Sequence, residues 1–326
     1  MNKESMISNR IFQYTFIGVV LMMINIFSVK ANSFYASQKD SPSVIGRWDI
    51  TVNMDGKQYP SWLEVHRSGI KTLVGEFVGI SGSARPISRI NFADGKMTFS
   101  LPPQWETYDN DLSFEAHFEV DNLAGTMTTG DGKTYTWTAV RAPFLHRSAE
   151  PVWQKPITLF NGKDLKGWHG ASGNQWIVKD GVLQIPHKGS NLMTDETFND
   201  FKLHIEFRYT EGSNSGVYLR GRYEVQIEAS HENEPLKNVF SAVYGFISPS
   251  EIVSKNPGEW QSYDITLIGR MVTIVANGKT VICNHEIPGI TGGAIDSNEG
   301  EPGPLVLQGD EQGQIEYRNI IITPAK

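Results

Sequence analysis

The 326-residue sequence contains one cysteine, Cys283, which excludes an intrachain disulfide. A chain of this length can bury enough core without one, so the absence is compatible with a periplasm-like compartment. Positive charge is also scarce: 29 Lys and Arg stand against 36 Asp and Glu, a net charge of -7. Nucleic-acid binding needs a basic surface, and we therefore expect no nucleic-acid partner.

Several sequence motifs that are typical of active sites are absent as well. The sequence has no HExxH, no paired CxxC, no nucleophile elbow and no phosphate-binding glycine loop. The acidic phrase DSNEGEPG at 296–303 lacks the calcium-loop pattern and is interpreted as a loop. The cofactor is therefore unknown at this point, with a divalent metal ion left open.

Amphipathic helices of more than two turns are absent too, whereas glycine, proline and aromatic residues are frequent. Short strand-like runs alternate with Asp-Gly and Asn-Gly pairs, which favour tight hairpins because both residues tolerate positive φ. The pattern predicts an all-β protein with a small antiparallel β domain over 45–143. A proline-containing linker over 144–152 precedes a larger sandwich or jelly roll over 153–326.

The N-terminal segment carries Lys3 and Arg10, then an apolar run, then small residues up to Ala31. This layout is typical of a secretory signal peptide over residues 1–31. A retained membrane anchor is the alternative, but polar residues interrupt the run and its basic flank is short. We expect an exported, periplasmic protein that begins near Asn32 and keeps no stable membrane anchor.

The stretch NSGVYLRGRYEVQIE, residues 214–228, alternates between apolar and polar residues. In a strand this period places one set in the core and the other on the opposite face. The polar set consists of Tyr218, Arg220, Arg222, Glu224, Gln226 and Glu228. It is either a solvated outer face or a sugar-binding groove.

A second run, FKLHIEFR at 201–208, alternates in the same way. If it pairs with SGVYLR, the polar faces merge into one patch that holds His204, Glu206, Arg208, Tyr218, Arg220, Glu224, Gln226 and Glu228. A structural ion-pair network is an equally weighted interpretation of the arginines. A two-residue turn at Gly221-Arg222 would flip the second strand, whereas a three-residue loop would keep the faces matched.

Two glutamates on one strand also suggest a glycoside hydrolase, because such enzymes use a pair of carboxyl groups. Glu224 and Glu228 would lie roughly 13 Å apart along the strand, which exceeds the spacing of the catalytic carboxyl pair in either retaining or inverting enzymes. A cross-strand pair such as Glu206 with Glu224 could still satisfy either spacing.

Five sequence blocks together point to one family: ITLFNGKDLKGW (157–168), GSNSGVYLRGRYEVQIE (212–228), AVYG (242–245), PGEWQSYDI (257–265) and GPLVLQGDEQGQIEYRNIIITP (303–324). From about residue 153 to the end, the chain resembles the 3-keto-disaccharide hydrolase domain family. The resemblance implies a concanavalin A-like jelly roll and a carbohydrate substrate. Two positions differ from many relatives. Glu228-Ala229 stands where they have an Asp, and Gly309-Asp310-Glu311-Gln312 stands where they have a His after the LQ pair.

The resemblance also implies a chemistry. A ketone at C3 makes the C2 proton acidic, so a base can remove it and expel the C1 substituent. Glu224 is the expected base, with Arg220 or a divalent ion at the ketone oxygen and His204 or Glu206 as the acid. The expected substrate-binding residues are Gln226, Glu228, Tyr218, Arg208, Asn214 and Gln308. A non-catalytic carbohydrate-binding protein and an ordinary glycosidase remain the alternatives.

Overall fold

The computed structural model describes residues 43–170, 175–229, 234–309 and 314–326. Val44–Lys326 form one compact unit. The signal peptide expected over residues 1–31 lies outside the described residues. Within the described part of the chain, no helix has the length and apolar character needed to cross a membrane.

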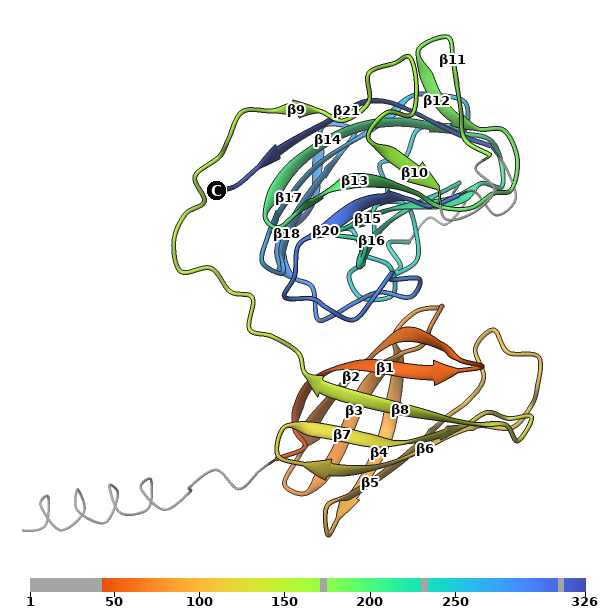
Figure 1. The fold of residues 1–326 in the computed structure, drawn as a ribbon, viewed down its shortest axis with the longest axis vertical. Coiled ribbons are helices and arrows are strands. Elements are labelled where there is room, and N and C mark those ends of the chain that lie inside the picture. Colours follow the sequence, from red (N-terminus) through yellow and green to blue (C-terminus); the bar gives the residue numbers. More distant parts are fainter. Residues whose placement is uncertain (1–42, 171–174, 230–233, 310–313) are drawn as a thin grey trace, which may run out of the picture. The chain divides into compact units, whose positions relative to one another are not determined.

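The first eight strands form a closed antiparallel barrel in which each strand pairs with its neighbour in sequence, and β1 closes the ring by pairing with β8 (Figure 1). The strands are β1 (Gly46–Met54), β2 (Lys57–Ser68), β3 (Thr72–Val78), β4 (Arg85–Ala93), β5 (Lys96–Leu101), β6 (Leu112–Glu119), β7 (Asn122–Thr128) and β8 (Thr134–Arg141). Closure removes the exposed edges that an open sheet of this size would present.

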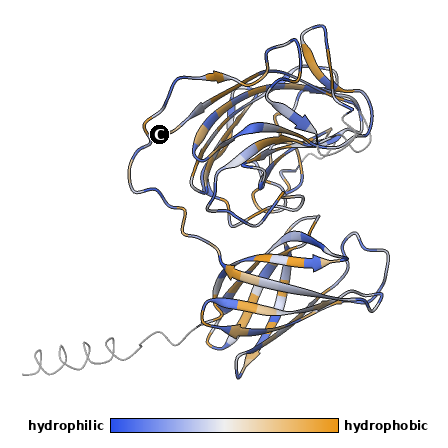
Figure 2. Cartoon of the chain, viewed as in Figure 1, coloured by the Kyte–Doolittle hydropathy of each residue, from blue (hydrophilic) through white to orange (hydrophobic). Residues whose placement is uncertain are grey.

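Period-two alternation explains the barrel core. Apolar and polar residues alternate along its strands (Figure 2), and the inward set packs as a cluster rich in aromatic rings. Phe99 and Phe114 stack with ring centroids 4.5 Å apart, Trp137 packs edge-on against Phe114, and Trp48 is buried in the same cluster. An eight-stranded barrel is narrow enough for side chains to fill, and the buried inward residues of this barrel pack as one core cluster.

The remaining strands form two further antiparallel sheets. The five-stranded sheet has the order β10-β13-β20-β15-β16, and the eight-stranded sheet has the order β11-β12-β21-β14-β17-β18-β19 with β9 also on β21. Their bounds are β9 (Ile157–Thr158), β10 (Trp168–Gly170), β11 (Ile177–Lys179), β12 (Val182–Ile185), β13 (Leu192–Phe198), β14 (Phe201–Tyr209), β15 (Asn214–Leu219), β16 (Tyr223–Glu228), β17 (Gln261–Ile268), β18 (Met271–Ala276), β19 (Lys279–Glu286), β20 (Gly303–Leu307) and β21 (Ile315–Pro324).

A single apolar core joins these two sheets. Val217, Val225 and Ile227 from the five-stranded sheet share it with Phe207 and Tyr263 from the eight-stranded sheet. Burying a side chain such as Val225 or Ile227 stabilises the fold by about 1.5–3 kcal/mol. The prediction of an all-β chain, with a jelly-roll sandwich after a smaller antiparallel β domain, is therefore confirmed.

Barrel residues also contact the loops of the sandwich. Trp62 and Val78 belong to the sandwich core cluster. The Gly293 N–H donates to the Ile80 carbonyl oxygen at 2.9 Å, and the Ser297 hydroxyl donates to the Ile50 carbonyl oxygen at 2.5 Å. The first bond brings the segment after β3 next to the loop between β19 and β20, and the second brings β1 next to the same loop.

Candidate active site

The β15–β16 hairpin sets which residues share a face. Leu219 pairs with Tyr223, so the connection is the three-residue loop 220–222 and the polar faces stay matched. Tyr218 lies opposite Glu224, and Gly216 lies opposite Gln226. On the other face of the hairpin, the apolar set predicted from alternation is buried in the core.

The polar face of this hairpin forms the floor of a pocket of about 500 Å³. Glu224 is only 3 % exposed there, and Tyr218 and Gln226 are equally buried. The residues that line the pocket come from the hairpin, from sandwich loops and from the barrel: Ser81, Gly82, Trp105, Asn214, Tyr218, Glu224, Gln226, Glu228, Asn238, Tyr244, Gly292, Gly293 and Gln308.

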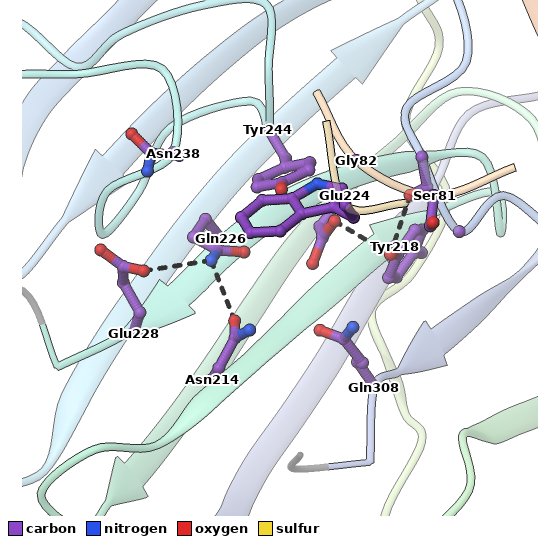
Figure 3. A pocket seen from close by; sticks show the side chains of 13 residues that line it. Ser81, Gly82, Asn214, Tyr218, Glu224, Gln226, Glu228, Asn238, Tyr244 and Gln308 are labelled. Atoms are coloured by element: carbon purple, nitrogen blue, oxygen red, sulfur yellow. Dashed lines mark hydrogen bonds between the residues drawn. The ribbon is translucent and has the colours of Figure 1, made fainter. Parts of the chain in front are cut away.

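The Glu224 carboxylate is held in a defined orientation. The Tyr218 hydroxyl donates to its Oε2 at 2.9 Å, as the dashed line in Figure 3 shows. The backbone is fixed as well: the Glu224 N–H donates to Thr291 Oγ1 and its carbonyl oxygen accepts the Tyr244 N–H, both at 3.0 Å. A carboxylate fixed by its neighbours is poised for chemistry, because its orientation costs nothing further on binding.

Gly216 makes room for this carboxylate. A Cβ at residue 216 would lie 2.4 Å from Glu224 Oε1 and 2.8 Å from its Cγ. We expect Gly216→Ala to displace the Glu224 side chain and to lower turnover about tenfold, which corresponds to about 1.4 kcal/mol of transition-state stabilisation. Steady-state kinetics on the folded variant measure this. Wild-type turnover in Gly216→Ala protein would mean that the position of the carboxylate is not critical.

Gln226 and Gln308 contribute hydrogen-bond acceptors. The Gln226 amide nitrogen donates to Asn214 Oδ1 at 3.0 Å and to Glu228 Oε2 at 3.5 Å (Figure 3). The Oε1 atoms of Gln226 and Gln308 are both buried without a partner among the described residues. A buried acceptor without a partner costs about 1–3 kcal/mol, so these oxygens favour a ligand that brings hydroxyl donors.

The charged side chains that line the pocket, among the described residues, are all acidic. Glu224 and Glu228 line it, and no Lys, Arg or His occurs among the described residues that do so. Groups of three or more His, Cys, Asp or Glu placed to hold a metal ion are likewise absent from the described part of the chain. The donors that could face a ligand are neutral: amides, hydroxyls and backbone N–H groups.

The sequence of the sandwich matches a known protein family. The model of the 3-keto-alpha-glucoside-1,2-lyase-like domain family matches residues 155–323, slightly more than half of the 326-residue chain. The chain belongs to this family. Membership of the 3-keto-alpha-glucoside-1,2-lyase-like family supports a carbohydrate-active, glycosyl hydrolase-like function, and it confirms the resemblance drawn from the sequence blocks.

Individual relatives are similar to parts of the chain. A 3-keto-disaccharide hydrolase of Bacteroides thetaiotaomicron is 26% identical over 97 residues, which cover 26% of this chain and only 33% of that protein. Two solved Parabacteroides distasonis structures, both provisionally described as glycosyl hydrolases, are similar to this chain. One is 28% identical with a TM-score of 0.46, and covers 56% of this chain and 94% of its own. The other is 25% identical with a TM-score of 0.42, and covers 52% and 98%.

Three residues expected at the site lie in the other sheet of the family domain. Strand β14 pairs with β17 and β21, not with β15, so the predicted merger of the polar faces is wrong. His204 Nδ1 lies 2.7 Å from Asp264 Oδ1, and Arg208 Nε donates to Glu316 at 2.6 Å. Neither residue, nor Glu206, lines the pocket.

Glu206 belongs instead to a network of ion pairs and hydrogen bonds. It accepts hydrogen bonds from Arg318 Nε at 2.5 Å and from Asn319 Nδ2 at 3.0 Å. Partial burial raises the pKa of Glu206, but the bonds from Asn319 and Arg318 outweigh it and the net pKa is lowered. The arrangement matches the structural alternative weighed for these charges.

Strand alternation also predicts the wrong position for Arg220. The residue lies in the hairpin loop with φ +54°, where the strand pleat no longer decides direction. Its guanidinium is fully buried, and Nη2 donates to the Tyr223 hydroxyl at 2.9 Å and to the Gly269 carbonyl oxygen at 3.0 Å. The prediction that Arg220 lines the pocket is therefore wrong.

Sequence reasoning missed several pocket residues. Tyr244 falls in the AVYG block, and Asn238 lies shortly before it. The presence of this block among the family's sequence blocks was a signal that the segment contributes to the site. Both side chains lie across the pocket from Gln308 (Figure 3). Ser81, Gly82 and Trp105 come from the barrel, and nothing in the local sequence pattern connects them to a hairpin more than a hundred residues away.

Proposed function

We propose that this chain cleaves 3-keto-glycosides or 3-keto-disaccharides by abstracting the C2 proton. The observation that carries the proposal is the buried, oriented carboxylate of Glu224 at the floor of an acceptor-rich pocket. The family description, which names a 3-keto-glucoside 1,2-lyase, supports the same substrate class and reaction.

The C3 ketone makes this chemistry accessible to a carboxylate. Glu224 takes the C2 proton, and the C2–H electron pair forms the C2–C3 double bond of an enolate while the ketone π pair moves to oxygen. The enolate then re-forms the ketone, its electrons make a C1–C2 double bond, and the C1–O bond breaks with its pair on the leaving oxygen. Solvent water donates a proton to that oxygen, and the protonated Glu224 carboxyl returns its own proton to solvent, which completes elimination. Addition of water across C1–C2 gives net hydrolysis.

Neutral amide groups provide the sugar contacts. Because Asn214 Oδ1 accepts from Gln226, the Asn214 Nδ2 group is left to donate to a substrate oxygen. The Oε1 atoms of Gln226 and Gln308 accept hydrogen bonds from the hydroxyl groups of the sugar. Amide donors near the ketone oxygen would stabilise the enolate charge in place of the arginine first expected.

Gln226→Ala should weaken substrate binding more than it slows the chemistry. The substitution removes one acceptor and releases Asn214 and Glu228, and a hydrogen bond of this kind contributes about 1 kcal/mol. We expect KM for a 3-keto-disaccharide to rise about fivefold with kcat nearly unchanged. An unchanged KM would argue against a contact between Gln226 and the sugar.

The deciding experiment compares a 3-keto-disaccharide with its unoxidised parent. Mass spectrometry of the products should show loss of the keto substrate alone, with either the unsaturated keto sugar or its hydrated form released. Turnover of the parent would favour an ordinary glycosidase. Among the described residues that alternative lacks a close carboxylate pair, because Glu224 and Glu228 are the acids that line the pocket there and lie four residues apart on one strand.

A non-catalytic carbohydrate-binding protein is the second candidate, and the unpartnered amide oxygens favour it equally. Binding of both sugars without product would decide for it. We also propose that the chain is exported, on the strength of the apolar segment that precedes Asn32. N-terminal sequencing of secreted protein tests this, since recovery of Met1 would contradict cleavage.

A further inference from the structure

Trp105 is an exposed aromatic residue that lines the pocket from outside the family domain. Its side chain is 70 % exposed, which is unusual for an indole. It lies in the segment between β5 and β6 of the barrel, whereas the family match begins at residue 155. Single exposed apolar residues are ordinary on protein surfaces, but this one adjoins a polar cavity.

The indole is held in place by its own barrel. A Cβ on residue 82 would come within 2.8 Å of Trp105 Cδ1 and Nε1, so the indole packs directly on the Gly82 backbone. Gly82 has φ +87°, a conformation that other residues adopt only under strain. Trp105 therefore has one flank fixed against the backbone while most of its surface is exposed.

The segment that carries Trp105 is anchored by a carboxylate. Glu106 Oε2 accepts the Gln104 N–H at 2.7 Å and the Trp105 N–H at 3.1 Å, and Oε1 pairs with Arg85 at 3.6 Å. Partial burial raises the pKa of Glu106, but these backbone hydrogen bonds and Arg85 outweigh it and the net pKa is lowered. Gln104 Nε2 donates to Ser83 Oγ at 2.6 Å, which ties the segment to the strand-connecting loop beneath it.

This loop of the barrel meets the sandwich at the pocket. The Gly293 N–H donates to the Ile80 carbonyl oxygen at 2.9 Å, so residues 80–82 lie against the same loop that supplies Gly292 and Gly293 to the pocket wall. The wall is therefore composite. Its deep part is polar and comes from β15–β16, and its exposed part includes a fixed aromatic ring from the barrel.

We propose that Trp105 is the stacking platform for the sugar that leaves from C1, so that the barrel sets which glycosides are accepted. The inference rests on the proposed function, because it requires that the keto sugar reach Glu224. With that sugar at the buried floor, its C1 substituent extends toward the exposed rim. The C–H face of a pyranose packs on an indole, and this contact tolerates differences in hydroxyl pattern.

The test compares Trp105→Ala and Trp105→Phe with wild type on two substrates. One is a 3-keto-disaccharide and the other is methyl 3-keto-glucoside, which has no leaving sugar. For Trp105→Ala we expect KM for the disaccharide to rise about tenfold with kcat within twofold, and KM for the methyl glycoside to stay constant. Trp105→Phe should recover part of the loss. Equal effects on both substrates, or none, would overturn the proposal.

Two controls separate this proposal from others. Phe144→Ala removes another exposed aromatic ring that does not line the pocket, and should leave both KM values unchanged. If wild-type protein turns over neither substrate, titration calorimetry with the unoxidised disaccharide still tests the platform. Weaker binding by Trp105→Ala would then support it while the proposed reaction fails. Equal binding by both proteins, or no binding by either, would refute it.

Discussion

Glu224→Gln protein should fold normally and lose turnover of a 3-keto-glycoside by about 10²-fold or more. The substitution keeps the shape of the side chain, and the Tyr218 hydroxyl can still donate to the amide oxygen as it donates to Oε2 now. An amide has no basicity at neutral pH, so the C2 proton has no acceptor at the floor of the pocket. KM should change little, because the sugar contacts remain.

Steady-state kinetics and thermal unfolding of the same preparation measure this prediction. Glu228→Gln is the matched control, since Glu228 carries the same charge at the end of β16 and is less buried. We expect that variant to retain most of its kcat. Near-wild-type turnover by folded Glu224→Gln protein would remove Glu224 as the base and direct attention to Glu228 or to residues outside the described part of the chain, such as His231.

Local sequence signals predicted much of the fold because hairpins are local structures. Asp55-Gly56, Asp94-Gly95 and Asn277-Gly278 all adopt positive φ at both residues, and each pair connects two antiparallel strands. The alternation of 217–227 likewise predicted which side chains reach the core. Both signals work because the residues concerned are within a few positions of each other.

Pairing between distant strands could not be predicted in this way. The sequences of β14 and β15 follow each other closely, and this proximity predicts a hairpin between them. In a jelly roll the chain instead passes from one sheet to the other, so β14 pairs with β21 and β17. Alternation describes one strand and does not identify the strand beside it, and for this reason Glu206 was grouped with Glu224.

Arg220 and Trp105 show two other limits of prediction from the sequence. Counting along a strand places Arg220 on the polar face, but the strand ends at Leu219 and the loop conformation turns the side chain into the interior. Trp105 lies in a segment without periodicity, and its place at the pocket depends on contacts between the barrel and the sandwich. The part of the site that one hairpin builds was predictable, and the part that packing builds was not.

The unfolding free energy should fall as pH rises from about 5 to 8, and Asp49→Asn should remove much of this slope. Asp49 is 4 % exposed on the outer side of β1 and is hydrogen-bonded to the buried Glu299. Burial and, next, the charge of Glu299 raise the pKa of Asp49 to about 9. The partner Glu299 has its pKa lowered despite burial, because Arg270 donates to both of its oxygens. One proton therefore stays on Asp49 in the folded protein.

The sign follows from proton uptake. Between an unfolded pKa near 3.9 and the raised folded value, the folded state holds a proton that the unfolded state has lost, so rising pH favours unfolding by up to about 1.4 kcal/mol per pH unit. The lowered pKa of Glu299 acts only below about pH 4.5, outside this window. An Asn at residue 49 still donates to Glu299 but cannot ionise. Urea titrations of both proteins at pH 5 and pH 8 measure the difference, with Asp55→Asn in an exposed turn of the same barrel as control. Parallel pH profiles for wild type and Asp49→Asn would mean that Asp49 is already ionised in the folded protein, and that Arg270 and Arg222 outweigh the burial of both acids.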